Sequence, residues 1–528
     1  MKFLGFYLPL LLLSSCAIVK VPTGGPEDKT PPSVISEVPE NPSTTFNSSE
    51  ITIKFDEYIE LKNPKTEIQI VPPLTLEPKI SVKNKKISIE LRDSLKKDIT
   101  YSFFFGNSIT DITEGNILKD YQYVLTTGNV LDSLEIRGQV KDAFTMQLVK
   151  NARVLLHPKG CDSCIFSAKP ISFTSSDEKG NFTLKYLKSG EYILYALEDQ
   201  NGDLNYDPGE RVAFLSNHIK LMNDTSNLKL LMFKEKDSVI KINELKYIGK
   251  SKLLCVLNMR ADHFKIYQLM DTNKVEITHY QANEGRDSFL FWIKDREHGD
   301  FILSLNDELS DTLTPFKSKI LKDEDKFEIA INPVFFGNNK GIWLKVNQLL
   351  NYIDPQKIRI YEDSVLINNV LIESNPHKSL FYRIDRDFKK GTQTRIILED
   401  SALYSFENKY NDSISYTFVV PSEEDLGKIQ ITVKADKTDF PVIIELINEK
   451  GIPLIENKLD QGSVFSYLFD DLWPGNYRFR IIIDRNGNGY WDSGNLNKGI
   501  QPEEVFYYNK EINLKPNWEI TDLEFEIP

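Results

Sequence analysis

The chain has 528 residues, which is too long for one hydrophobic core, and 41% of them are apolar, so several packed domains are expected. Its formal net charge is −13, with acidic and basic residues interspersed, which argues against a nucleic-acid-binding surface. Segments rich in Ile, Val, Tyr, Phe and Thr recur about every 8 to 12 residues, a spacing typical of β-sandwiches. The sequence therefore predicts an all-β protein, a tandem array of about five sandwich domains.

The N-terminal sequence predicts an export signal. Lys2 precedes an apolar run over 3–13, which is too short to cross a bilayer but has the length of a signal-peptide core. The run ends in Leu-Ser-Ser-Cys, which resembles the lipobox of bacterial lipoproteins, in which the cysteine is diacylated and becomes the first mature residue. The resemblance implies a signal peptide over 1–15, a lipidated Cys16 and a flexible tether over 16–30. An ordinary cleaved signal with a chance cysteine is the alternative.

Lipidation of Cys16 predicts the compartment. Several acyl chains at about 0.8 kcal/mol per buried methylene give stable membrane attachment. An acidic residue directly after the lipidated cysteine would resemble an inner-membrane retention signal. Ala17 stands at this place and is not acidic, so we expect a lipid anchor in the outer membrane. The face of that membrane stays open.

The first predicted domain covers 31–130. It contains Pro31-Pro32, a long strand-like segment over 51–59, an aromatic segment over 95–105 and a closing Thr-Thr-Gly over 126–128. These features resemble the bacterial Ig-like domain of the S-layer type. Asp111 and Asn116 flank turn residues and are expected to hold a loop in place, not to bind a ligand.

The second predicted domain covers 131–235. Its strand-like segments over 136–140, 151–156, 182–184 and 187–194 are separated by glycines. The order of these segments resembles the carboxypeptidase-regulatory or transthyretin-like β-sandwich, a family that usually serves as a structural or docking module. Residues 236–325 are predicted to form a β-sandwich of unknown type.

The second half of the chain repeats the first. Residues 342–346 align with 51–55, which predicts a second Ig-like domain over 326–422. A segment that begins at Gly190 returns 285 residues later, at Gly475, which predicts a second transthyretin-like sandwich over 423–528. Repeats at this spacing are typical of stacked domains, which usually build an extended shape and not a catalytic cleft.

The repeated segment is a strand followed by an oxygen-rich loop. In the first copy the oxygen donors follow the spacing of an EF-hand calcium loop, although Leu204 takes the place of the EF-hand glycine and flanking helices are missing. The second copy has Gly489 at that place but fewer carboxylates, and Asn495 aligns with Glu210. We predict structural calcium at both loops, bound more tightly by the first; turns without metal are the alternative. The candidate ligands are Asp199, Asn201, Asp203, Asn205, Asp207 and Glu210 in the first loop and Asp484, Asn486, Asn488 and Asp492 in the second.

Cys161 and Cys164 form the other compact motif. In an exported protein such a pair predicts a local disulfide that stiffens a loop. A redox-active pair would need a thioredoxin-like context, which the sequence does not show. A zinc site that adds His157 would lack an evident fourth ligand.

Signatures of catalysis are missing from the sequence: there is no Gly-x-Ser-x-Gly, His-Glu-x-x-His or Gly-rich phosphate loop. We therefore expect a non-enzymatic envelope protein that acts as a scaffold or protein-interaction module, with other envelope proteins as partners. Calcium is the one cofactor expected. The alternative is a surface adhesin or carbohydrate-binding lipoprotein that uses Trp491, because the strand pattern directs Trp343 and Trp473 to the core. A hydrolase is a more distant alternative.

Overall fold

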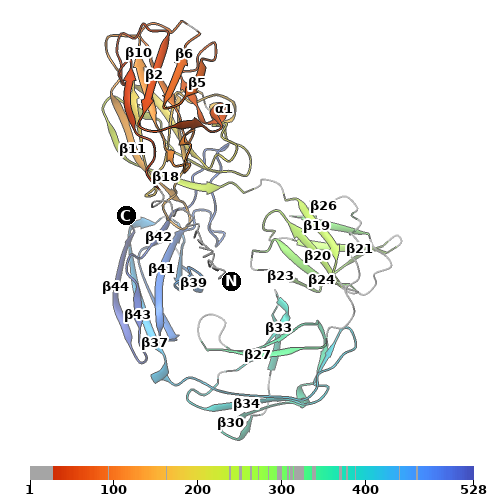
Figure 1. The fold of residues 1–528 in the computed structure, drawn as a ribbon. Coiled ribbons are helices and arrows are strands. Elements are labelled where there is room, and N and C mark those ends of the chain that lie inside the picture. Colours follow the sequence, from red (N-terminus) through yellow and green to blue (C-terminus); the bar gives the residue numbers. More distant parts are fainter. Residues whose placement is uncertain are drawn as a thin grey trace, which may run out of the picture.

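A computed structural model of the chain describes residues 28–527 with internal gaps, so the predicted signal peptide, Cys16 and most of the tether lie outside the described residues. Regular structure is almost entirely β, in small sheets that fall into five groups along the chain (Figure 1), which confirms the predicted array of β-sandwiches. We call these groups units 1 to 5. The gaps are at 93, 162, 237–239, 249–251, 262–263, 271–272, 284, 294–299, 306–307, 310–312, 314, 316–325, 336–340, 368–370, 376–377, 387, 439 and 460–461.

Unit 1 encloses its core between a four-stranded sheet, in the order β1-β2-β6-β5, and a three-stranded sheet, β10-β7-β4. Ile51, Ile53 and Phe55 are fully buried while Lys54 between them is exposed, the alternation of a strand with one solvated face. The elements of unit 1 are β1 (Val34–Val38), β2 (Glu50–Phe55), β3 (Ile59–Leu61), α1 (Pro64–Glu67), β4 (Gln69–Val71), β5 (Lys79–Lys83), β6 (Lys86–Glu90), β7 (Thr100–Phe104), β8 (Ile109–Asp111), β9 (Ile117–Leu118) and β10 (Gln122–Thr126).

Unit 2 is organised by its first strand, which pairs antiparallel with β14 and parallel with the last strand, β18. Strand β15 pairs with β12, β16 and β17, and its alternate residues face two different cores. The elements of unit 2 are β11 (Leu134–Asp142), β12 (Arg153–Pro158), α2 (Cys164–Ser167), β13 (Ser172–Ser175), β14 (Asn181–Leu187), β15 (Gly190–Leu197), β16 (Arg211–Phe214), β17 (Ile219–Leu221) and β18 (Thr225–Lys234).

Unit 5 repeats the pairing of unit 2. Its first strand pairs antiparallel with β40 and parallel with the last strand, β44, and β41 pairs with β38, β42 and β43. The elements of unit 5 are β37 (Gly427–Thr438), β38 (Val442–Ile447), β39 (Pro453–Leu459), β40 (Gly462–Leu472), β41 (Gly475–Ile483), β42 (Val505–Tyr507), β43 (Ile512–Leu514) and β44 (Glu519–Ile527).

Units 3 and 4 share one sheet, because β23 of unit 3 pairs with β33 of unit 4 through Gln281 and Lys378. The elements of unit 3 are β19 (Ile242–Tyr247), β20 (Lys252–Leu257), β21 (Phe264–Met270), β22 (Asn273–Glu276), β23 (Tyr280–Ala282), β24 (Ser288–Trp292), β25 (Phe301–Leu305) and β26 (Glu308–Leu309). The elements of unit 4 are β27 (Ile329–Val334), β28 (Gly341–Val346), β29 (Leu350–Ile353), η1 (Pro355–Lys357), β30 (Ile358–Glu362), β31 (Val365–Ile367), β32 (Leu371–Asn375), β33 (Lys378–Asp385), β34 (Gln393–Leu398), β35 (Leu403–Ser405) and β36 (Ile414–Val419), followed by η2 (Glu423–Asp425).

The five units do not form the extended array that the repeat predicts. The chain turns back on itself, so that unit 5 lies beside unit 2 and the units follow a closed path (Figure 1). Unit 1 also packs directly on unit 2, where the rings of Phe104 and Phe173 lie 4.3 Å apart. Within the part of the chain that is described, no helix has the length and apolar character needed to cross a membrane.

Candidate functional site

Asp199 opens the first oxygen-rich loop, which joins β15 to β16. Its carboxylate accepts backbone N–H groups from Gly202 at 2.8 Å and Leu204 at 3.1 Å. Leu204 has φ +63°, in the left-handed region that costs a non-glycine residue about 1–2 kcal/mol. The Leu204 side chain is only 3% exposed and packs in the apolar cluster that contains Ile193 and Tyr195 of β15. This burial offsets the backbone cost, so a leucine can replace the EF-hand glycine.

Glu210 closes the same loop from its far end. Its carboxylate is 6% exposed and accepts the N–H groups of Gln200 at 3.0 Å and Asp207 at 3.1 Å. The side-chain nitrogen of Asn201 donates to the carboxylates of Asp207 at 2.8 Å and Asp203 at 3.2 Å. The loop is therefore held by a ring of its own hydrogen bonds.

These contacts bear on the calcium prediction. The loop gathers the predicted oxygen donors, and Asn205 joins them through its N–H bond to Asp203, at 2.7 Å. The carboxylates of Asp199 and Glu210 nevertheless already accept backbone N–H groups. The side-chain nitrogen of Asn201 lies between the carboxylates of Asp203 and Asp207. Among the described residues no three His, Cys, Asp or Glu side chains are grouped to hold a metal ion. Calcium stays a prediction, which would require Asn201 to present its amide oxygen instead.

The second loop, between β41 and β42, repeats this architecture. Asp484 accepts the N–H groups of Asn488 at 3.1 Å and Gly489 at 2.7 Å. Gly489 has φ +82°, in the same left-handed region as Leu204 of the first loop. The side-chain nitrogens of Asn486 and Asn488 both donate to Asp492, at 2.6 Å. The candidate ligands of the second loop are thus brought together as the sequence repeat implies.

Glu503 occupies the place that the alignment gave to Asn495. It is 5% exposed and accepts the N–H groups of Arg485 at 2.7 Å and Asp492 at 2.9 Å, which are the counterparts of the two bonds to Glu210. The sequence comparison missed it because the second loop is longer before its closing glutamate. The available signal was its position just before β42, as Glu210 stands just before β16.

The longer second loop docks on unit 2 around Phe144. The ring of Phe144 lies 5.0 Å from that of Trp491, and the guanidinium of Arg480 lies 4.3 Å from the Phe144 ring centre. The hydroxyl of Tyr507 donates to the main-chain oxygen of Phe144 at 3.2 Å. Arg480 is itself buried and paired with Glu445. We call this contact between units 2 and 5 the seam.

Polar contacts complete the seam. Lys236 of unit 2 pairs with Asp492 at 2.6 Å, and the N–H of Leu496 donates to Glu235 at 2.6 Å. Burial would raise the pKa of the Asp492 carboxyl, but Lys236 and the loop amides outweigh burial and lower it. A lysine ammonium from the neighbouring unit therefore supplies the positive charge next to the second loop.

The second loop packs closely against unit 2. A Cβ atom on Gly494 would lie 2.6 Å from the ring of Phe233, so only glycine fits there. The loop also reaches unit 3, where the guanidinium of Arg260 lies 3.6 Å from the Tyr490 ring centre. One loop thus contacts two other units of the array.

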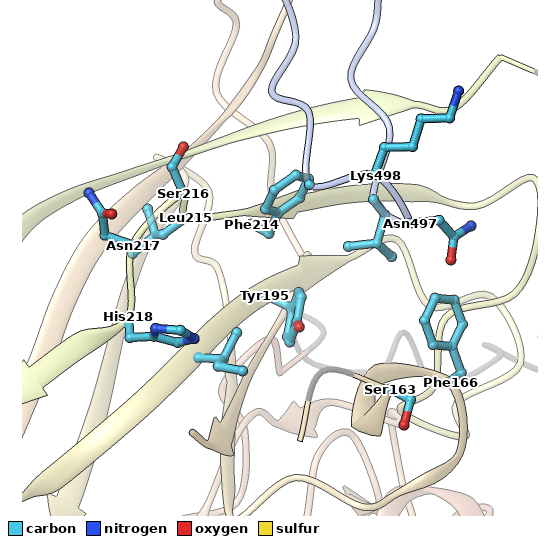
Figure 2. Close-up of a pocket in the computed structure, with 13 residues that line it drawn as sticks. Ser163, Phe166, Tyr195, Phe214, Leu215, Ser216, Asn217, His218, Asn497 and Lys498 are labelled. Atoms are coloured by element: carbon cyan, nitrogen blue, oxygen red, sulfur yellow. The ribbon is translucent and has the colours of Figure 1, made fainter. Parts of the chain in front are cut away.

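A groove of about 540 Å³ lies along the seam (Figure 2). Unit 2 provides nine of its 13 lining residues, and the second loop of unit 5 provides the other four. In Figure 2 the ring of Tyr195 lies in the middle of the groove, with Phe166 and Asn497 at one end and His218 and Asn217 at the other. The lining residues are Ser163, Phe166, Ile193, Tyr195, Phe214, Leu215, Ser216, Asn217, His218, Leu496, Asn497, Lys498 and Gly499.

The Cys161–Cys164 pair shapes one wall of this groove. A disulfide joins the two cysteines, and α2 begins at the second of them. The N–H of Tyr206, in the first oxygen-rich loop, donates to the main-chain oxygen of Ile165 at 2.7 Å, which ties this helix to the loop.

His157 does not join the cysteines in a metal site among the described residues. Its ring is fully buried, 5.8 Å from that of Tyr195, and neither ring nitrogen has a hydrogen-bond partner in the described part of the chain. Burial lowers the pKa of His157 to about 4, so the ring is neutral at pH 7.

The tryptophans do not follow the strand-pattern prediction. Trp343 alternates with the buried residues Ile342 and Leu344, so it lies on the face opposite the core. Trp473 follows β40 and is 40% exposed. Trp491, the predicted carbohydrate platform, is instead packed in the seam, where its indole N–H donates to the main-chain oxygen of Glu503 at 3.0 Å.

Comparison with known proteins identifies one part of the chain. Residues 28–127 match the bacterial Ig-like domain family. Unit 1 is therefore an Ig-like domain, as its sequence predicted. The likeness of units 2 and 5 to transthyretin-like domains stays a prediction, and comparison with curated sequences gives no match.

Several solved structures show a distant likeness. The TIE protein of Bacillus anthracis is 11% identical, over 96% of this chain and 75% of that protein, at a TM-score of 0.15. The major pilin subunit BcpA of Bacillus cereus is 10% identical, over 75% of this chain and 99% of the pilin, at 0.14. The N-terminal part of the bacterial S-layer protein SbsC is 15% identical, over 39% of this chain and 44% of that chain, at 0.14.

Proposed function

We propose that this protein is a non-catalytic lipoprotein of the outer membrane that acts as a structural scaffold or protein-interaction module. The seam is the observation that carries this proposal. It brings units 2 and 5, which are far apart in the sequence, into direct contact, an arrangement suited to presenting several surfaces in a set arrangement.

The Ig-like match of unit 1 supports the same role by analogy of fold alone. The predicted lipid anchor at Cys16 and the tether that follows it would attach unit 1 to the membrane. The units themselves would then lie in the aqueous space next to it, with partners among other envelope proteins.

Two experiments test this proposal. Replacing Cys16 with serine should move the protein from the outer-membrane fraction to the soluble fraction, whereas a Ser15→Ala control should stay in the membrane. Membrane retention of the Cys16 variant would contradict the anchor.

In-cell crosslinking with mass spectrometry tests the scaffold role. The wild-type protein should yield a reproducible set of envelope proteins, and Phe144→Ala, which weakens the seam, should lose part of that set. A set that is unchanged by the variant would show that the closed arrangement does not matter for partners.

A further inference from the structure

Three lysines form a row across one face of unit 1, in a chain whose net charge is −13. Lys54 of β2 lies directly opposite Lys86 of β6, and Lys86 lies directly opposite Lys83 of β5. All three are exposed, and none makes a hydrogen bond or ion pair with a residue that the structure describes. Like charges directly opposite one another on adjacent strands destabilise a sheet. An anionic partner beside the row would offset this cost.

The face that carries the row is turned away from the rest of the chain. Lys54 stands between the fully buried residues Ile53 and Phe55, so its side chain points away from the core. Unit 2 packs against the other sheet of unit 1, through Phe104 of β7. Unit 1 lies at one end of the molecule (Figure 1). The β1-β2-β6-β5 sheet therefore presents its outer face, with the lysine row, to solvent.

The rest of this face is polar and nearly balanced in charge. The next row along the strands carries hydroxyl groups, which can donate hydrogen bonds to phosphate oxygens, from Thr52, Ser88 and Ser81. Glu50 and Glu90 lie beyond that row, and Glu90 pairs with Lys79 at 4.0 Å. Uncompensated positive charge is therefore concentrated at one end of the face.

The chain enters unit 1 at this same end. Ser33, just before β1, donates its N–H to the carboxylate of Asp56 at 2.8 Å. Lys85, in the turn between β5 and β6, donates to the main-chain oxygen of Asp56 at 2.5 Å. Ser33 stands 17 residues after Cys16 in the sequence, a distance that a fully extended chain spans in roughly 60 Å. With Cys16 anchored as proposed above, the end of unit 1 that carries the row is the end held next to the membrane.

Carboxylates also lie at this end of unit 1. Asp56 accepts the N–H and the hydroxyl of Ser33, and Asp111 is only 1% exposed and accepts three N–H groups of its own loop. Burial and the charges of Asp111 and Asp56 raise the pKa of Glu57, which shows that these carboxylates lie close to one another. None of them pairs with a lysine of the row. The sheet face, and not the tip of the domain, is therefore the side that attracts an anionic surface.

We propose that this face of unit 1 docks on a membrane surface that carries phosphate-bearing anionic lipids. Lys54, Lys83 and Lys86 bind lipid phosphates, and the hydroxyls of the next row lie against the headgroups. Each basic residue near such a surface contributes an attraction that salt screens. The inference rests on the lipid anchor proposed above, which supplies the proximity, and it adds which side of unit 1 faces the membrane.

Co-sedimentation with lipid vesicles tests the proposal on residues 17–528, which include every residue that the structure describes and lack the lipidated cysteine. This protein should bind vesicles of phosphatidylglycerol and phosphatidylcholine in equal amounts, but not vesicles of phosphatidylcholine alone, and added salt should weaken the binding. Replacing all three lysines of the row with glutamine should weaken binding about a hundredfold, at about fivefold per lysine. The matched control removes the same charge from units 2 and 5 and should bind as wild type does; it replaces the exposed residues Lys188, Lys498 and Lys510 with glutamine.

Equal binding to both kinds of vesicle, or equal losses in the row variant and the control variant, would overturn the proposal. Tighter binding to soluble polyphosphate than to the vesicles would also overturn it. Lys86→Gln alone, at the centre of the row, should bind about fivefold more weakly and decides the matter if the triple variant does not fold. Because the protein carries no lipid, these outcomes are separate from the failure of the anchor, which fractionation of the Cys16 variant detects.

Discussion

Replacing His157 with phenylalanine gives a sharp test of the buried face of unit 2. The imidazole is fully buried, and its two nitrogens have no hydrogen-bond partner among the described residues. A buried polar group without a partner costs about 1–3 kcal/mol, so an apolar ring of similar shape should leave unit 2 as stable at pH 7.5 or stabilise it by roughly 1 kcal/mol.

The pH dependence gives the larger and more specific signal. The folded protein holds the pKa of His157 at about 4, below the unfolded value of 6.5. As the pH falls, His157 therefore takes up a proton in the unfolded state before it does so in the folded state. The free energy of unfolding keeps its full value at this site above pH 6.5 and decreases as the pH falls toward 4. The loss at pH 4.5 amounts to about 2.5 kcal/mol, at 1.36 kcal/mol per pKa unit.

Hydrogen exchange of the β12 and β15 amides measures this effect within unit 2, where a global melting curve of a multi-unit chain would not. Wild type should lose protection between pH 7.5 and 4.5 by about 2.5 kcal/mol more than His157→Phe. His157→Leu serves as a second variant if phenylalanine overpacks the site. Equal pH dependence in wild type and both variants would show that the imidazole is solvated or hydrogen-bonded, which would refute the reasoning.

Three further predictions concern the seam and its loops. Phe144→Ala should weaken the seam by about 2 kcal/mol, as loss of a central aromatic anchor does, and raise the radius of gyration in X-ray scattering, whereas the exposed-residue control Tyr58→Ala should not. Glu503→Ala should make the second loop sensitive to proteolysis, with a loss of about 2 kcal/mol, because two partly buried N–H groups lose their acceptor; Asn495→Ala should cost less, and the opposite order would support the sequence alignment over the structure. Calcium should give calorimetric heat that Glu210→Gln reduces more than Glu503→Gln does, since the first loop has more carboxylates; no heat and no change in melting temperature with chelator would leave both loops as hydrogen-bonded turns.

Local patterns in the sequence were enough to predict the fold class and the internal repeat. The alternation of Ile51, Ile53 and Phe55 with polar residues marks a half-buried strand wherever it occurs. The Asp, Asn and Gly residues of the two loops marked the duplication because each supports a turn through its own side chain or backbone freedom.

The seam could not be predicted in this way. Phe144 is one aromatic residue in a turn, and the sequence around Trp491 is equally compatible with a surface platform for a ligand. Only the contact between the two rings shows that they join units 2 and 5. Glu503 was missed because a longer loop shifts it out of the expected spacing, although its burial and bonds match those of Glu210. Trp473 departs from the strand pattern because it follows the end of β40, where the alternation of faces no longer applies.

A zero-length carbodiimide crosslink between Lys236 and Asp492 tests the closed arrangement of units 2 and 5 most directly. The two groups lie 2.6 Å apart although they are 256 residues apart in sequence. In dilute purified protein, mass spectrometry should find the Lys236–Asp492 peptide at a yield similar to that of Lys434–Glu524, an exposed pair within unit 5 that lies 2.7 Å apart. Formation of the Lys434–Glu524 link without the Lys236–Asp492 link would show that the seam is open in solution and would contradict the account.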